Sequence, residues 1–427
     1  MNGQEAPGAR GTRGPQQLAE PAGGGLGAPA AWPVGELPTE PVGSLPRPAR
    51  LQRAVLDAEL GLASAAELAA EQERAVRDTL AGLEATGSPI VTDGEQRRQS
   101  FSSYPLGENP DRGAPGTDPV LAVFADGHHR VIPRLAQAPF EFRGWAANDV
   151  AAARQLTSLP IKQAVVSPSM LSLIWPEGEA ASAALAGRSF AGYSRAEFLD
   201  DVVAGCAEDI RRSFAAGASR VTIDFTEGRL ALRRDLRAPW AGPAALAGFI
   251  DLMNRVLELV PRELRAAVGV HTCPGNDQDS AHSADVDYAD LIPELFQIEA
   301  GYFLVQAAGE PDPDRVARLV GRQLRQRSAA GGRAPRVLFG VTNPTSPKLE
   351  TEAEIAEQLV RAARFVPPEL IGSTDDCGFS PYLIDEKPRH GSPDFAREVA
   401  FAKVAARVRG TLRAGAVLAG RPEEVLV

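Results

Sequence analysis

Two short segments carry side chains whose types and spacing could bind a metal ion. Residues 268–275 (VGVHTCPG) are typical of the end of a buried strand, and they place His271 and Cys273 two residues apart. Side chains two apart on a strand point to the same face, so the imidazole and the thiol would converge. A second apolar segment, 370–379, ends in a polar turn that contains Cys377. The three side chains together could hold one metal ion.

One His and two Cys, with a fourth position left open, form the ligand set of a catalytic zinc site rather than a structural one. A lone His or Cys is more often a packed core residue. Here, however, three such residues lie at the ends of predicted strands in a chain with only three Cys and five His. The third cysteine, Cys206, lies in a helical pattern and is predicted to be a packed thiol. Because thiolate ligands make zinc a modest Lewis acid, activation of an incoming thiol for S-alkyl transfer is the predicted chemistry.

Composition restricts the classes of protein that remain. A chain of 427 residues with 44% hydrophobic content can bury a large core as one or two α/β domains. Three Cys give no disulfide framework, so a reducing cytoplasm is expected. The net charge of −10 argues against a nucleic-acid partner, and no apolar run is long enough to span a membrane. The expected partners are small molecules.

Strand-like and helix-like patterns alternate from residue 37 onward. Eight alternations predict an α/β fold, a (β/α)8 TIM barrel, with a doubly wound open sheet as the alternative. The predicted strands are 41–47, 88–95, 161–168, 220–227, 266–273, 302–307, 336–342 and 370–374. The predicted helical windows are 51–85, 196–215, 243–260, 285–297, 312–326, 351–365 and 394–414.

The chain is expected to form one catalytic domain over residues 37–427. Residues 1–36 are rich in Gly, Ala and Pro, so we expect a disordered tail that is dispensable for chemistry. Residues 102–148 do not fit one crossover and are interpreted as an insertion after the second strand. Short apolar runs at 120–124 and 129–132 predict a small hairpin in this insertion, near the mouth of the barrel.

Polar side chains follow nearly every predicted strand, at the end where barrel enzymes place their active sites. Each of these side chains has an ordinary alternative as a helix N-cap or a solvated turn residue. They are Ser44, Asp93, Glu95, Ser167, Ser169, Asp224, Glu227, Gln306, Glu310, Thr342, Asn343, Asp375 and Asp376.

Over residues 38–415 the chain resembles the catalytic domain of cobalamin-independent methionine synthase and its shorter single-barrel relatives. The His-x-Cys pair with a distant Asp-Cys-Gly is the specific part of this resemblance. The matching segments are 42–47 (VGSLPR), 92–98 (TDGEQRR), 167–175 (SPSMLSLIW), 223–227 (IDFTE), 271–273 (HTC) and 375–379 (DDCGF). The resemblance implies a zinc ion that activates homocysteine for methylation, with a methyltetrahydrofolate as co-substrate.

The resemblance also implies roles for single residues. Asp224 would bind the amino group of the amino-acid thiol, Ser44 its carboxylate, and Trp175 would lie against the pterin of the folate. The implied zinc ligands are His271, Cys273 and Cys377. Further candidates are Ser169 for the folate, Glu95 and Arg98 for the substrate, and Asp224, Glu95 and Asp376 for catalysis.

The chain departs from the family pattern at two positions. Gln306 stands where the family has its fourth zinc ligand, a glutamate, and Glu310 follows one turn of loop later. Either Glu310 coordinates the metal, or the zinc has three protein ligands and a solvent molecule. Thr345 lies near the place of the family's proton-donating His, which weakens the case for a folate donor.

Two alternatives therefore stay open. The epoxyalkane:coenzyme M transferases, a related branch, use zinc to transfer a thiol such as coenzyme M onto an epoxide or a similar alkyl electrophile. A zinc-free lyase resembling the uroporphyrinogen decarboxylases would instead use Asp93, Arg97 and Arg98 around an anionic substrate. The His/Cys/Cys set separates these two alternatives, because the lyase does not need it.

Overall fold

The computed structural model describes residues 32–33, 35–107, 120–123, 129–135, 138–176, 192–233, 241–273, 275, 286–380, 382–384 and 390–421. Within these ranges six strands form one sheet in chain order, and every neighbouring pair is parallel. The strands are β3 (Ile161–Val166), β4 (Ala218–Asp224), β5 (Val268–Thr272), β6 (Tyr302–Val305), β7 (Arg336–Gly340) and β8 (Ile371–Thr374). The predicted α/β class and the six strands from residue 161 onward are confirmed.

Each edge of this sheet is extended by a single bridged residue. Thr39 pairs in parallel with Ser373 of β8, and Val91 pairs in parallel with Ile161 of β3. The predicted strands 41–47 and 88–95 are therefore wrong as full strands. Prolines at 38, 41, 46 and 48 remove backbone donors from the first segment, and positive φ angles at Gly94 and Glu95 end the second.

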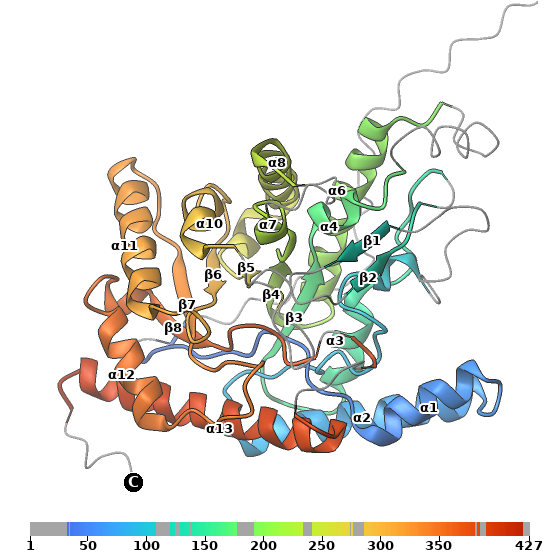
Figure 1. Ribbon diagram of the computed structural model, residues 1–427, viewed down its shortest axis with the longest axis horizontal. Helices are drawn as coiled ribbons and strands as arrows, with labels where there is room; N and C mark the ends of the chain where they lie inside the picture. The colour runs from blue at the N-terminus through green and yellow to red at the C-terminus, as the bar shows by residue number, and fades with distance from the viewer. Residues whose placement is uncertain are drawn as a thin grey trace, which may run out of the picture.

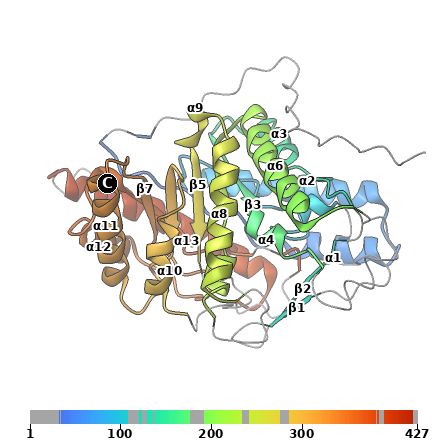
Figure 2. The same ribbon diagram turned by 90° about the horizontal axis from the view of Figure 1, so that it is seen from above.

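A ring of helices surrounds the sheet (Figures 1 and 2). In the order α2, α3, α6, α8, α10, α11, α12 and α13, each helix contacts the next, and α13 contacts α2. Their bounds are α2 (Ala65–Ala85), α3 (Ala146–Arg154), α6 (Arg195–Ala215), α8 (Pro243–Leu259), α10 (Tyr288–Leu295), α11 (Pro313–Ala329), α12 (Glu352–Ala362) and α13 (Pro393–Leu418). The closed helix ring is consistent with a TIM-barrel-like fold, although the described strands do not pair into a closed sheet.

Within the described ranges, the remaining helices are short or lie outside the ring. They are α1 (Ala49–Glu59), α4 (Pro168–Ser172), α7 (Glu227–Leu230) and α9 (Arg262–Arg265), with one-turn 3-10 helices at Tyr104–Leu106 and Pro368–Leu370. The predicted helical window 51–85 divides into α1 and α2. Gly61 has a φ of 71° just after α1, and Ser64 starts α2 with a capping box that includes Glu67.

The predicted hairpin is present as β1 (Val120–Val123) and β2 (His129–Ile132), which pair antiparallel. The chain that follows it contacts the loop after β3. The Leu135 N–H donates to the carbonyl of Ile174 at 2.8 Å, and the Arg134 guanidinium donates to the carbonyl of Trp175 at 3.0 Å. This part of the insertion therefore lies beside α4, towards the carboxyl end of the sheet (Figure 2).

A small apolar cluster is separate from the main hydrophobic core. It consists of Val42, Tyr302, Leu304 and Leu338, and Trp32 packs against it. Trp32 belongs to the segment predicted as a disordered tail, whose residues 1–31 and 34 lie outside the described residues. No helix in the described part of the chain is both long and apolar enough to cross a membrane.

Candidate metal centre

His271, Cys273 and Cys377 come together at the carboxyl end of the sheet. One ligand atom from each lies within 4.8 Å of the others, and all three residues are buried. The sulfur atoms of Cys273 and Cys377 are 2.8 Å apart. His271 is in β5, Cys273 directly follows that strand, and Cys377 follows β8. The i, i+2 spacing thus places imidazole and thiol on one side of the strand, as predicted.

Neighbouring groups orient these three side chains. Asp224, at the end of β4, lies 3.0 Å from Nδ1 of His271, and Nε2 of the same ring lies 3.4 Å from the carbonyl oxygen of Asp376, the residue before Cys377. The Gly275 N–H donates to the sulfur of Cys273 at 3.2 Å. A carboxylate behind a ligating His is the common arrangement at zinc sites, because it fixes the tautomer and the ring orientation.

The electrostatics of the cluster favour an anionic thiolate. Burial raises the pKa of Cys273, but the hydrogen bond with Cys377 and the charge of His271 outweigh this effect and lower that pKa to about 5. Burial lowers the pKa of His271, yet Cys273 and Asp224 raise it to about 10. A divalent cation would replace the protons that now neutralise these groups. One nitrogen and two sulfur donors, all buried and convergent, fit zinc with one coordination position open.

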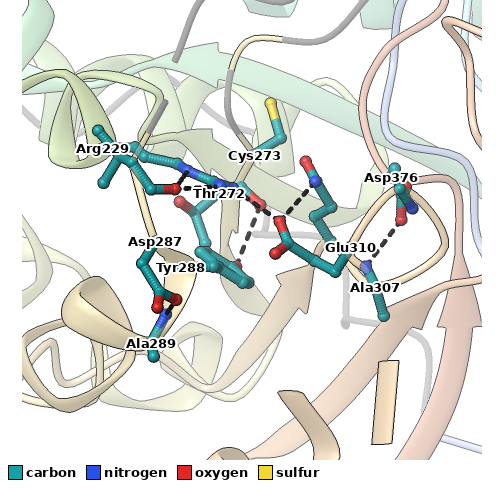
Figure 3. A network of polar contacts seen from close by, with 12 residues as sticks. Arg229, Thr272, Cys273, Asp287, Tyr288, Ala289, Ala307, Glu310 and Asp376 are labelled. Atoms are coloured by element: carbon teal, nitrogen blue, oxygen red, sulfur yellow. Dashed lines mark hydrogen bonds and ion pairs between the residues drawn. The ribbon is translucent and has the colours of Figure 1, made fainter. Parts of the chain in front are cut away.

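Asp376 has both carboxylate oxygens occupied by backbone amides. Its Oδ1 accepts from Ala307 N at 2.8 Å (Figure 3) and from Ala308 N at 2.9 Å, and its Oδ2 accepts from Gly309 N at 2.5 Å. This residue, predicted to be catalytic, therefore fixes the loop after β6 beside Cys377. Its neighbour Asp375 is turned the other way and pairs with Arg407 of α13.

Glu310 lies outside the group of three metal-binding side chains. Its Oε1 is 3.0 Å from the Arg229 guanidinium and accepts from the Gln306 amide at 2.7 Å (Figure 3). Gln306 and Glu310, the two sequence candidates for a fourth ligand, thus bind each other. Among the described residues, the fourth position receives no ligand from the protein.

Glu95 and Ser44 lie close to the cluster. Glu95 is buried and has a φ of 57°, a conformation that costs energy in a residue other than glycine. Burial raises the pKa of Glu95 to about 7, and its Oε2 has no hydrogen-bond partner in the described structure.

Ser44 binds the loop that carries Cys377, since its hydroxyl accepts from Ser380 N at 3.3 Å and its carbonyl from Phe379 N at 3.1 Å.

Arg98, a predicted substrate residue, is engaged by the protein itself. Its guanidinium donates to Asp149 of α3 at 2.8 Å and to the carbonyl of Ala164 in β3 at 3.0 Å. It also lies over the ring of Tyr104, 4.2 Å from the centroid. These contacts join the loop at 93–98 to β3 and α3, so the structure gives Arg98 a clear supporting role.

The two predicted folate residues lie after β3. The hydroxyls of Ser167 and Ser169 both donate to Glu227 at the start of α7. Trp175 is half-buried, and its ring lies 5.1 Å from that of Phe198 and 6.1 Å from that of Tyr193. Ser169 thus supports Glu227, and Trp175 joins an aromatic cluster against α6.

Arg229 was missed by the sequence analysis. Arg229 lies two residues after Glu227 and is buried. Because arginine is mostly an exposed residue, the sequence does not indicate this burial. The signal that the sequence offered was the position of Arg229 shortly after the predicted strand 220–227, at the end where barrel enzymes place their active sites.

Comparisons with known proteins concern the fold. No family model matches the sequence, and no curated protein matches it. The structure is similar to a B12-independent methionine synthase from Shewanella sp. W3-18-1 in complex with selenomethionine, with a TM-score of 0.60 and 19% identity, covering 92% of this chain and 99% of that one. The chain has the fold of B12-independent methionine synthases. This bears out the resemblance that the sequence motifs indicated.

Two further structures extend this likeness. A Listeria monocytogenes protein described as a vitamin-B12 independent methionine synthase has a TM-score of 0.58 and 18% identity, covering 87% of this chain and 96% of that one. A methyltransferase from Methanosarcina mazei has a TM-score of 0.50 and 12% identity, covering 89% and 94%. At these identities the likeness to methionine synthases is one of fold, so the chemistry has to be argued from the site.

Proposed function

We propose that the protein is a zinc-dependent thiol alkyltransferase that transfers a methyl group to homocysteine and so forms methionine. The observation that carries this proposal is the buried group of His271, Cys273 and Cys377, to which the described chain adds no fourth ligand. When bound, zinc would act as a Lewis acid that lowers the pKa of an incoming thiol.

Two buried carboxylates support an amino-acid thiol as the acceptor. Asp224 contacts His271 directly, and its charge contributes to the raised pKa of Glu95, so the two carboxylates lie near each other. An ammonium group placed between them would neutralise both and would satisfy the unpartnered oxygen of Glu95. Ser44, tied to the loop of Cys377, would help to hold the carboxylate of the same substrate.

We favour homocysteine over the two alternatives. A thiol such as coenzyme M has no amino group and would leave the buried oxygen of Glu95 without a partner. A decarboxylase-like lyase would have no use for the two convergent thiols.

We propose a methyltetrahydrofolate as the methyl donor, held beside Ser169 and Trp175. Thr345, near the expected position of a proton donor, is bonded to Asn343 and does not titrate in the physiological range. A proton for the folate must therefore come from solvent or from another group. Glu227 accepts a hydrogen bond from Ser169 beside this proposed donor site, and burial raises its pKa to about 7.

The test is zinc content combined with zinc-edge absorption spectra. We expect about one zinc per chain in the wild type, and one more sulfur neighbour after addition of homocysteine but not of coenzyme M. Cys273→Ser and Cys377→Ser, made separately, should each weaken zinc binding by at least about tenfold. Cys206→Ser is the matched control, because Cys206 is equally buried but lies in α6. A zinc-free wild type, or unchanged zinc binding in both site variants, would refute the proposal.

A further inference from the structure

Arg229 is a buried cation that the proposed reaction does not use. Its Nε and Nη2 atoms donate to the carbonyl of Val286 at 3.2 and 2.6 Å, and its Nη1 atom lies 3.0 Å from Glu310. The guanidinium also lies 4.9 Å from the centroid of the Tyr288 ring. These contacts come from two different segments, so the position of Arg229 is well fixed.

Glu310 is held beside the metal centre but is directed away from it. It directly follows Gly309, whose amide is bound by Asp376, the neighbour of Cys377. In Figure 3 the Glu310 carboxylate points towards Arg229, and the sulfur of Cys273 points away from that carboxylate. Gln306 donates to the same Glu310 oxygen at 2.7 Å.

The pairing has a consequence for charge at the metal position. A zinc ion with one neutral His and two thiolates carries no net charge, whereas a fourth, carboxylate ligand would make the site anionic. An anionic site would bind a substrate thiolate less well and would lower its pKa less. Without Arg229, the half-buried Glu310 would lack its cation, and the metal would be the available substitute.

We propose that Arg229 is a positioning residue that withholds Glu310 from the metal, so that the fourth coordination position stays available to the substrate thiol. This inference rests on the proposed metal-dependent function. In this proposal the Arg229–Glu310 pair ensures that the metal binds the substrate thiol rather than the Glu310 carboxylate.

The experiment uses Co²⁺ in place of zinc, because its visible spectrum reports the number and type of ligands. Co²⁺ affinity is measured by chelator competition, and the sulfur-to-metal charge-transfer band is recorded during titration with homocysteine. Four proteins are compared: wild type, Arg229→Met, Glu310→Gln and the double variant. Methionine keeps much of the length of arginine but removes its charge.

Arg229→Met should bind Co²⁺ at least about tenfold more tightly and should need about tenfold more homocysteine for the same band. The double variant should return to within about twofold of the wild type, because an amide then replaces the carboxylate that could reach the metal. Glu310→Gln alone should leave Co²⁺ affinity and spectrum unchanged. If Arg229→Met does not fold, Glu310→Gln still tests the proposal, because weaker Co²⁺ binding in that variant would refute it.

Two outcomes would overturn the inference. One is an Arg229→Met protein with wild-type Co²⁺ affinity and thiol response. The other is a Glu310→Gln protein that binds Co²⁺ more weakly with an altered spectrum, since Glu310 would then already be a ligand in the wild type. Failure of the wild type to bind Co²⁺, or to respond to homocysteine, would instead refute the underlying function.

Discussion

The carboxylates around the metal position differ in what their oxygens contact. Asp376 binds backbone amides, Glu310 pairs with Arg229, and Asp224 orients His271. Glu95 is different, because one of its oxygens has no hydrogen-bond partner in the described structure and its backbone is strained. This contrast assigns supporting roles to Asp376 and Glu310 and leaves Glu95 as the acceptor for a substrate ammonium group.

Glu227 should make stability depend on pH. Burial raises its folded-state pKa to about 7, against the opposing effect of two serine hydroxyls, from an unfolded value near 4.5. Between these values the folded state keeps a proton that the unfolded state releases, so stability falls as pH rises from about 4.5 to 7. The full loss is on the order of 3 kcal/mol. Glu227→Gln should remove this dependence.

The measurement is urea unfolding of wild type and variant at several pH values from 4.5 to 8. The wild type should lose stability relative to Glu227→Gln across this range, and the difference should level off above pH 7. Glu263→Gln, at an exposed position of α9, is the control and should follow the wild type. Parallel curves for wild type and Glu227→Gln would contradict the assignment.

Among the helices and strands, the strands that were predicted correctly are those that a local sequence pattern determines. Short apolar runs bounded by turn residues mark β3 to β8. The predicted strand 220–227 ran three residues too far, because Glu227 begins α7 and β4 ends at Asp224. Spacing alone could bring His271 and Cys273 together. The pairing of Arg229 with Glu310 was not predictable, since nothing local marks an ion pair between α7 and the loop after β6.

Arg407 of α13 supports the segment that carries Cys377. It is buried in α13 and pairs with Asp375, two residues before Cys377, and it also donates to the carbonyl of Glu40 at 3.0 Å. Arg407→Met should lower the free energy of unfolding by about 3–5 kcal/mol, because Asp375 would be left buried and unpaired. Chemical denaturation measures this change.

The matched control for this prediction lies on the same helix. Arg409 forms an exposed ion pair with Glu352, so Arg409→Met should cost at most about 1 kcal/mol. Equal losses in the two variants would show that Arg407 contributes no more than a surface pair.

In the whole molecule, the metal-binding group and the aromatic packing around Trp32 lie at opposite ends of the strands. The metal-binding group lies at the carboxyl end of the strands, whereas Trp32 lies near residues that begin them. Its ring is 3.5 Å from the guanidinium of Arg220 and 5.1 Å from the ring of Tyr302. Arg336 lies over the same indole at 5.2 Å. Trp32, which precedes the first predicted strand, thus packs at the amino ends of the strands against the small apolar cluster that contains Tyr302.

This separation predicts that stability and metal binding can be changed independently. Trp32→Ala should lower the free energy of unfolding by about 2–3 kcal/mol, through lost packing and two lost cation–π contacts. Zinc affinity should stay unchanged, because the metal-binding side chains follow the opposite ends of the strands. Phe395→Ala, at an exposed aromatic residue, is the control and should change stability by less than about 1 kcal/mol. Zinc affinity that falls together with stability in Trp32→Ala would mean that the two ends of the molecule are coupled.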